Sequence, residues 1–317
     1  MKEIGGYIEY DRFTGSMLYE DGVKLNCGRN ALAYLIEAKG IKKIYMPYFN
    51  CDSCNKILKE YGVGTKYYHI DEKFKPIIDK IGDDEWIYII NYYGQLTESD
   101  ILYYQNLYKN IIIDNAQAYF CQHLDGVDTI YSCRKFFGVA DGAILYTNVL
   151  LNRSLQYDES FERMHFLLGR YERSGQEFYG EYVANNRLFE EEPLKKMSRL
   201  TENILHGIDY EQINQVRTQN FIFLDKQLNK MNMIKLHVPK GAYMYPLYIE
   251  NGGEIRRKLH ERKIFVPTLW PNVLETLDKN SREYDWAKNI LPLPVDQRYG
   301  QDDMEYLVAE ITKIVCA

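Results

Sequence analysis

An apolar run that ends in an acid is the feature of this sequence that most constrains the fold. Three β-branched residues, Ile111, Ile112 and Ile113, lead directly into Asp114. A run this short predicts a strand buried on both faces, as at the centre of a parallel sheet covered by helices. In open α/β sheets, ligands bind beyond the carboxyl ends of the strands. We therefore expect Asp114 at a ligand-binding edge.

A second short strand is expected to place a lysine at the same edge of the sheet. The segment 128–131 is rich in β-forming residues, and Ser132 and Lys135 follow it. A lone lysine after a strand is usually a solvated charge, and an aspartate there commonly caps a helix. An amine and an acid on neighbouring strand ends, however, suit pyridoxal 5'-phosphate (PLP), which needs a lysine for its Schiff base and an acid that keeps its ring nitrogen protonated. Lys135 and Asp114 are therefore the candidate catalytic residues.

A glycine turn near the N-terminus predicts a cradle for the cofactor phosphate. Gly28, Arg29 and Asn30 open a helical pattern that stops at Gly40. Such a turn aims backbone N–H groups and the positive end of the helix at an anion, and Arg29 adds a full positive charge.

Two polar side chains complete the predicted cofactor site. Ser132 stands three residues before Lys135, close enough for its hydroxyl to reach an anion beside the lysine. Gln117 lies one helical turn after Asp114, from where it could reach the phenolic oxygen of the ring.

The order of short β-rich runs and helical stretches predicts an α/β fold. Alternation of this kind argues for a mostly parallel sheet flanked by helices, and a length of 317 residues favours a second, smaller domain. We expect a large α/β domain over residues 1–205, with a charged, helical linking region from about 151, and a small α+β domain over residues 206–317. The expected strands are 43–46, 65–70, 86–91, 111–114, 129–131, 143–147 and 243–248, and the expected later helices are 216–231, 254–261 and 302–315.

Composition excludes several classes of function. The net charge of −6 gives no basic footprint for nucleic acid, and no apolar run is long enough to cross a membrane. The N-terminus lacks the apolar core of a signal peptide, and six cysteines without framework spacing suit a reducing cytoplasm.

The spacing of Cys51 and Cys54 resembles that of redox or zinc motifs. A zinc site needs further ligands, and no second cysteine pair or histidine pair stands at a matching spacing. We therefore expect neither a metal site nor redox chemistry at these two cysteines.

The sequence resembles the DegT/DnrJ/StrS-type aminotransferases, which are PLP enzymes of fold type I that aminate nucleotide-linked keto-sugars. The resemblance extends over nearly the whole chain. It rests on these segments: Cys27-Gly-Arg-Asn-Ala-Leu32, Met46-Pro-Tyr-Phe-Asn-Cys51, Asn91-Tyr-Tyr-Gly-Gln95, Asp114-Asn-Ala-Gln-Ala118, Ser132-Cys-Arg-Lys135, Arg217-Thr-Gln-Asn220, Ile264-Phe-Val-Pro-Thr-Leu-Trp-Pro271 and Leu291-Pro-Leu-Pro294. It implies a mostly parallel, seven-stranded sheet and a homodimer with shared active sites at the subunit interface.

Three departures from the family pattern place the chain on a divergent branch. The loop from Ser132 to Lys135 is two residues shorter than usual, and Cys51 stands where an aromatic side chain normally stacks on the cofactor. The motif that reaches the phosphate from the other subunit becomes 194–197, with Lys195 and Lys196. Arg29 would then supply the missing contact, and Lys195 or Lys196 of a partner subunit would share it.

The resemblance implies a ping-pong aminotransferase. Lys135 would carry PLP as a Schiff base, L-glutamate would be the amino donor, and pyridoxamine 5'-phosphate (PMP) would then aminate a keto-sugar nucleotide or a similar ketone. Two alternatives stay open. One is a PLP enzyme of elimination, dehydration or non-sugar transamination, and the other is a non-catalytic protein that retains the fold.

Overall fold

The centre of the molecule is an eight-stranded sheet. The structure is a computed structural model, and it describes residues 4–78 and 80–316. The strands follow the order β1-β8-β7-β6-β5-β2-β3-β4 across the sheet. Their bounds are β1 Val23–Leu25, β2 Lys43–Pro47, β3 Gly64–Ile70, β4 Pro76–Ile77, β5 Trp86–Ile90, β6 Ile111–Asp114, β7 Asp128–Ser132 and β8 Ala143–Tyr146.

The middle of the sheet is parallel, as the sequence predicted. The pairs β3–β2, β2–β5, β5–β6 and β6–β7 are parallel, whereas β8, β1 and β4 join antiparallel at the two sides. Strand β6 is buried at all four positions, and Asp114 pairs in register with Ile90 and Ile130. The carboxyl ends of β5, β6 and β7 therefore meet at one edge of the sheet.

The sheet has one strand more than the seven expected, because a tight turn adds β4. The carboxylate of Asp71 accepts hydrogen bonds from the backbone N–H groups of Lys73 and Lys75, both at 2.8 Å. Phe74 adopts a positive φ of 62° within this turn. The chain thus reverses at once, and Pro76–Ile77 pairs antiparallel with the end of β3.

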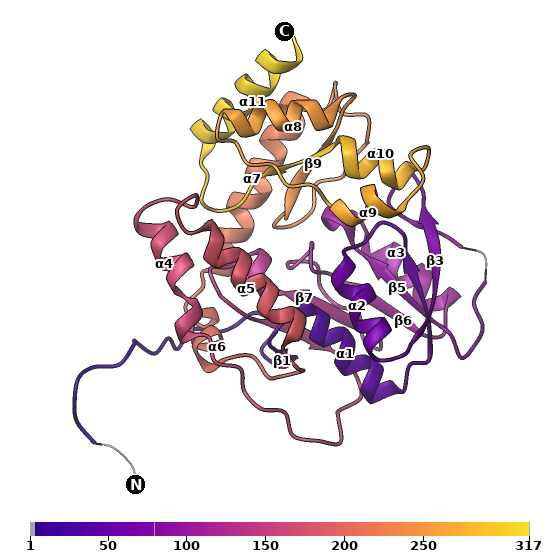
Figure 1. Ribbon diagram of the computed structural model, residues 1–317, viewed down its shortest axis with the longest axis vertical. Helices are drawn as coiled ribbons and strands as arrows, with labels where there is room; N and C mark the ends of the chain where they lie inside the picture. The colour runs from indigo at the N-terminus through magenta and orange to yellow at the C-terminus, as the bar shows by residue number, and fades with distance from the viewer. Residues whose placement is uncertain (1–3, 79, 317) are drawn as a thin grey trace.

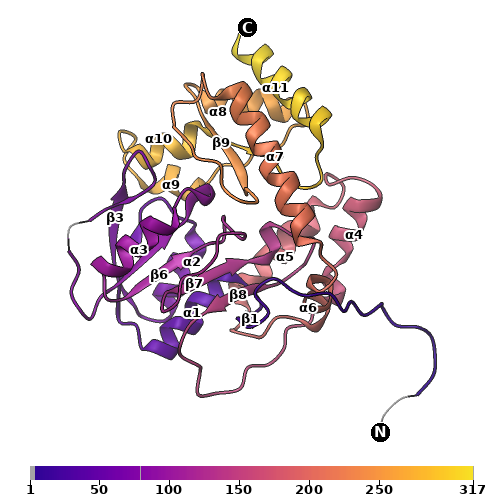
Figure 2. The same ribbon diagram turned by 180° about the vertical axis from the view of Figure 1, so that it is seen from behind.

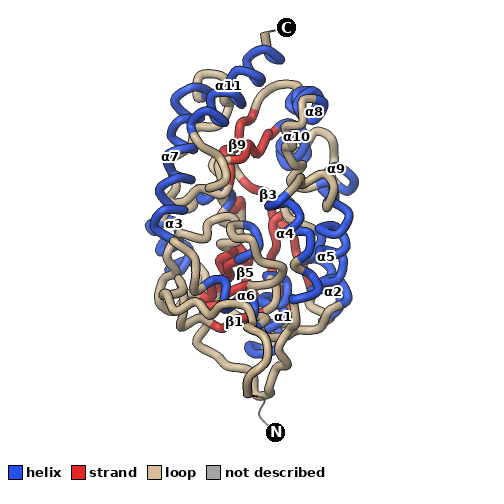
Figure 3. The backbone as a smooth tube through the Cα atoms, turned by 90° about the vertical axis from the view of Figure 1, so that its left-hand side faces the viewer, coloured by secondary structure: helices blue, strands red, loops and turns tan. Residues whose placement is uncertain are grey.

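Helices cover both faces of the large sheet. Figure 3 shows α3 on one side of the strands, and α1, α2 and α5 on the other. Helix α1 spans Gly28–Lys39, α2 spans Asp52–Glu60 and α3 spans Glu98–Leu107. Gly40 ends α1 in the left-handed conformation, with φ 63°, which is the cap expected from the sequence. Short 3₁₀ turns are η1 Tyr92–Gly94, η2 Cys133–Lys135 and η3 Phe161–Arg163.

The linking region is helical only in its second part. Residues 148–160 run without a helix, and the helices are α4 His165–Glu172, α5 Tyr179–Glu191 and α6 Arg199–Leu205. The N-terminal segment extends away from the rest of the molecule, at the end opposite the C-terminus (Figure 1).

A smaller α+β unit follows. Helix α7 leads from the linking helices into it (Figure 2). Its elements are α7 Tyr210–Leu228, β9 Met244–Tyr248, α8 Gly252–Glu261, α9 Pro271–Thr276, α10 Arg282–Asn289, β10 Ile290–Pro294 and α11 Gln301–Val315. Strands β9 and β10 pair antiparallel over an apolar cluster of their own that includes Phe221, Leu259 and Ile311. The boundary at 205/206 stays a prediction.

One buried arginine joins this unit to the large sheet. Arg217 is only 2% exposed, and its guanidinium donates to the carbonyl oxygens of Ala242 and Phe136, at 3.0 and 3.2 Å. Gln297 donates to the same Phe136 oxygen at 2.8 Å. Because Phe136 follows Lys135 directly, this joint fixes the loop that carries the lysine.

None of the helices in the described ranges is both long and apolar enough to span a membrane.

Candidate functional site

Asp114 ends β6 as a buried, doubly hydrogen-bonded acid. Its side chain accepts from the Tyr88 hydroxyl and from the Ala116 backbone N–H, each at 2.8 Å, and the residue is 9% exposed. Burial raises the pKa of Asp114, and the nearby charge of Lys135 is the largest influence in the opposite direction. The carboxylate is therefore held in one orientation and gains from a positive charge beside it.

Lys135 stands at the end of η2, just beyond β7. Its Nζ lies 5.6 Å from the centroid of the Tyr243 ring. The residue as a whole is exposed, although protein surrounds its amine. Displacement of water by the surrounding protein lowers the pKa of Lys135, but the acidic groups of Tyr243, Asp114 and Cys51 raise it by more, so it lies above its ordinary value.

Asp114 and Lys135 thus share one electrostatic environment. Each influences the pKa of the other, yet they form no direct ion pair within the described residues. A carboxylate and an amine that interact across a gap are compatible with a ring that has an acid at one end and an amine at the other.

The N-terminus of α1 is an open end that can receive an anion. Cys27 caps it without a side-chain hydrogen bond, and its first turn contains no acidic residue. A Cβ built on Gly28 would meet no atom within 4 Å, so the space beside its backbone is free. Free N–H groups at a positive helix end are suited to a phosphate.

The other residues predicted for the phosphate differ in their availability. In the described part of the chain, the hydroxyl of Ser132 caps no turn and stays free to donate. Arg29 donates to the carbonyl of Phe189 on α5 at 2.9 Å, which turns its guanidinium toward that helix. The side-chain nitrogen of Asn30 donates to Asn26 and to the Pro193 carbonyl, at 2.9 and 3.0 Å, so this group is already used within the protein.

Gln117 is buried beside η1. Its Oε1 accepts from the Tyr93 backbone N–H at 2.9 Å, and the residue is 2% exposed. Tyr93 has a positive φ of 53°, so this bond holds a strained turn in place. No donation by the Gln117 side-chain nitrogen occurs within 4–78 and 80–316, which leaves that group for a ligand oxygen.

Cys51 is the N-cap residue of α2, and it lies in the electrostatic environment of Asp114 and Lys135. Its Sγ lies 2.9 Å from the Ser53 hydroxyl and 3.9 Å from the Cys54 Sγ. Both Lys135 and Asp114 influence the pKa of its thiol. The position predicted to lie against the cofactor ring therefore carries a thiol close to the acid and the amine.

Sequence reasoning missed two tyrosines of this site. Tyr88 holds the Asp114 carboxylate, and the ring of Tyr243, from the loop before β9, faces Lys135. Tyr88 lies inside a strand like any core residue, and Tyr243 comes from another part of the chain. Neither carries a local signal of its role.

The two lysines suggested as partner contacts are engaged within their own chain. Lys195 pairs with Glu192 and approaches Asp158 at 4.0 Å. The Nζ of Lys196 lies 5.1 Å from the centroid of the Tyr157 ring.

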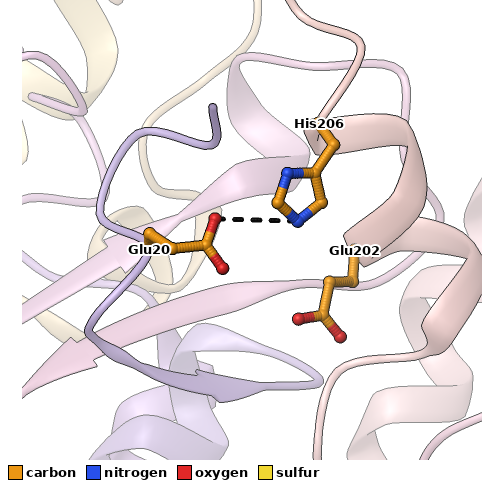
Figure 4. A group of neighbouring side chains, drawn as sticks. All are labelled: Glu20, Glu202 and His206. Atoms are coloured by element: carbon orange, nitrogen blue, oxygen red, sulfur yellow. Dashed lines mark ion pairs between the residues drawn. The ribbon is translucent and has the colours of Figure 1, made fainter. Parts of the chain in front are cut away.

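A second group of ligand-type side chains lies near β1. Ligand atoms of Glu20, Glu202 and His206 come within 4.8 Å of one another. Figure 4 shows these three side chains facing one another. Lys24 already pairs with both carboxylates, at 2.7 and 2.8 Å, and His206 lies 3.6 Å from Glu20. These ion pairs account for the cluster, and we assign it no ligand.

The chain is similar to solved structures of aminotransferases. No protein-family model matches the sequence, and no curated protein matches it. NtdA from Bacillus subtilis, solved with its cofactor PMP, has a TM-score of 0.67 at 14% identity over 93% of this chain and 73% of its own. The sugar aminotransferase CalS13 from Micromonospora echinospora has a TM-score of 0.60 at 15% identity, over 92% and 86%. A DegT/DnrJ/EryC1/StrS aminotransferase from Brucella abortus has 0.62 at 13% identity, over 92% and 85%.

Identities this low show the fold alone. That fold is the one predicted, fold type I with a mostly parallel sheet, and the chain shares it with sugar aminotransferases of the DegT/DnrJ/EryC1/StrS type.

Proposed function

We propose that this protein is a PLP-dependent aminotransferase that uses Lys135 and Asp114. The observation that carries the proposal is that Asp114 ends β6 and Lys135 follows the adjacent parallel strand β7, so that each lies in the electrostatic environment of the other. In a fold shared with NtdA, which was solved with PMP, this pair has the charges that the cofactor requires.

The side chains around this pair fit the cofactor. The open N-terminus of α1 at Gly28, together with the Ser132 hydroxyl, would hold the phosphate. Asp114 would hold the protonated ring nitrogen, and the free side-chain nitrogen of Gln117 would donate to the phenolic oxygen. PLP supplies an aldehyde that bonds to an amine and a ring that accepts electrons from the carbon under attack.

Lys135 would have two tasks in this reaction. Its amine would first hold the cofactor aldehyde until the amino donor takes its place. The released amine would then carry a proton between the α-carbon of the donor and C4′ of the cofactor. Asp114, fixed by Tyr88 and the Ala116 N–H, would keep the ring nitrogen protonated throughout.

The substrates that we propose are L-glutamate as the donor and a keto-sugar nucleotide, or a similar ketone, as the acceptor. Support comes from the motifs of the sequence and from a fold shared with the sugar aminotransferase CalS13. We place the protein in the cytoplasm, which suits its six unpaired cysteines.

We also propose a homodimer. Large apolar side chains are exposed along the linking region, at Phe161 (65%), Leu168 (59%), Tyr171 (93%) and Tyr179 (62%). Exposed apolar side chains gathered on neighbouring segments are typical of a surface that another chain covers. A second copy seated there is the simplest symmetric solution.

The test is a half-reaction with purified protein. PLP added to the wild type should give the absorbance of a lysine-bound cofactor, and L-glutamate should convert that species with release of 2-oxoglutarate. Lys135→Ala should give neither change. Equal spectra for both proteins would contradict the role of Lys135. Cofactor binding without turnover of any amino donor would favour a binding protein instead, and keto acid with loss of a leaving group would favour elimination.

A further inference from the structure

Cys51 and Cys54 form a close thiol pair in the first turn of α2. Their Sγ atoms are 3.9 Å apart. The S–S bond of a disulfide is about 2.05 Å long. Rotation of the two side chains would have to bring the sulfur atoms closer by this difference. Among the residues that the structure describes, no second thiol lies at this distance from any of the other four cysteines, Cys27, Cys121, Cys133 and Cys316.

The two thiols differ in access, as the two members of a redox pair do. Cys51 is half-buried at the helix N-terminus, whereas Cys54 is 6% exposed. A hydrogen bond from the Cys54 thiol, with smaller help from the Ser53 hydroxyl and the charge of Lys135, lowers the pKa of Cys51 to about 6. The same hydrogen bond, together with burial, raises the pKa of Cys54. The accessible sulfur is therefore the nucleophile, and the buried one is placed to resolve its oxidised form.

A metal does not explain the pair as well as redox chemistry does. Zinc requires about four ligands, and thiolate pairs that bind it are joined by further cysteines or histidines. Within the residues that the structure describes, the one cluster of three or more ligand-type side chains is the group around Glu20, which contains neither thiol.

The pair is also connected to Asp114. The Tyr88 hydroxyl, which donates to the Asp114 carboxylate at 2.8 Å, also influences the pKa of the Cys54 thiol. A change in the state of Cys54 would therefore reach the acid through a single side chain.

We propose that Cys51 and Cys54 are a redox-active pair that peroxide oxidises to an intrachain disulfide. The Cys51 thiolate attacks one oxygen of hydrogen peroxide, the O–O bond breaks, and one water leaves once the departing hydroxide takes a proton. The Cys54 sulfur then attacks the Cys51 sulfenic acid, an S–S bond replaces the S–O bond, and a second water leaves. Two thiols lose two electrons and two protons, and one peroxide is reduced to two waters. The disulfide rests on the geometry of the thiols and not on the proposed function.

The test treats the reduced full-length protein with hydrogen peroxide, then alkylates the remaining thiols and maps the peptides. We expect the wild type to lose two alkylatable thiols, at Cys51 and Cys54, with a mass lower by two hydrogens, and to recover both with dithiothreitol. Cys316→Ser, which removes an exposed cysteine outside the pair, should behave in the same way at these two positions. Cys54→Ser should form no disulfide and should accumulate a sulfenic acid at Cys51 that dimedone traps.

Rates of alkylation test the same assignment without a variant. At pH 6 the thiolate fraction of Cys51 should exceed that of an ordinary thiol by roughly 100-fold. The lower nucleophilicity of a low-pKa thiolate offsets about 10-fold of this, so Cys51 should react about 10-fold faster than Cys316.

Two results of the peroxide experiment would overturn the proposal. The first is that Cys51 and Cys54 both stay alkylatable after peroxide while Cys316 is oxidised. The second is that Cys54 is oxidised at the same rate in Cys51→Ser.

Discussion

At the scale of single residues, the acid of the site depends on a tyrosine that no sequence pattern identifies. Tyr88 donates to Asp114, and this bond lowers the pKa of a carboxyl that burial raises. The tyrosine therefore favours the ionised form of Asp114, together with the Ala116 N–H and the charge of Lys135, and this is the form that a protonated cofactor ring requires.

Tyr88→Phe should weaken cofactor binding without unfolding the protein. A hydrogen bond to a charged group contributes about 1.5–3 kcal/mol, so the Kd for PLP should rise by about 10-fold or more, with the larger effect at the lower pH because the pKa of Asp114 rises. Titration of PLP absorbance at several pH values measures this. Tyr245→Phe is the matched control, since Tyr245 donates to Asp225 in the small unit at 3.2 Å. An unchanged Kd for Tyr88→Phe would show that Asp114 does not hold the ring.

Sequence reasoning correctly placed the residues that lie at or just beyond a strand end, whereas their roles stay predictions. Asp114, Ser132 and Lys135 lie at the carboxyl edge because β6 and β7 are adjacent and parallel. It could not foresee that the amide of Asn30 is used by Asn26 and the Pro193 carbonyl, because that contact joins segments far apart in the chain.

At the scale of elements, the open end of α1 is the feature most readily changed. Gly28→Ala adds a methyl group where no atom lies within 4 Å, so the free energy of unfolding should stay the same or rise by up to about 1 kcal/mol. If the phosphate lies against this backbone, the Kd for PLP should rise by at least about 10-fold. Thermal unfolding and PLP titration separate the two effects. Gly180→Ala, also free of neighbours and located on α5, should change neither quantity; wild-type affinity in Gly28→Ala would exclude this helix end as the cradle.

Strand β5 begins beside an acid that makes stability depend on pH. A hydrogen bond from the Gly82 backbone N–H, followed by the ion pair with Lys66 on β3, lowers the pKa of Glu85 to about 2 from an ordinary 4.5. Because the folded pKa is the lower one, this stabilisation is complete above pH 4.5 and is lost as the pH falls through about 2. The wild type should therefore exceed Glu85→Gln in free energy of unfolding above pH 4.5, and the difference should shrink toward pH 2, as urea denaturation can measure. A difference that is constant over this range would contradict the assignment.

The elements that the sequence did not predict are those with weak local signals. Strands β1 and β4 have three and two residues, too few to show alternation. Strand β10 contains Pro292 and Pro294, which argue against a strand, but a two-stranded sheet leaves every strand an edge that tolerates them. Helix α7 starts at Tyr210, earlier than predicted, because Asp209 caps it by accepting from the Gln212 N–H at 3.0 Å.

At the scale of the whole molecule, the small unit is attached at the place where the lysine loop needs support. Arg217 and Gln297 both donate to the Phe136 carbonyl, and Arg217 also reaches Ala242. The position of Tyr243 over Lys135 depends on the same joint.

Arg217→Met should lower the free energy of unfolding by roughly 2–4 kcal/mol, because buried carbonyl oxygens lose their donor. Chemical denaturation measures the loss. Arg257→Met, which removes exposed ion pairs with Glu254 and Glu261, should lower the free energy of unfolding far less, because solvent screens these pairs. Equal losses in the two variants would mean that the joint is not a principal contact between the units.

The most direct test of the central claim is to trap the cofactor on its lysine. Protein incubated with PLP is reduced with borohydride, digested, and mapped by mass spectrometry. We predict that the phosphopyridoxyl group is found on Lys135, and that its yield falls in Asp114→Asn. Labelling at another lysine, or no labelling of Lys135 in a folded wild type, would contradict the account.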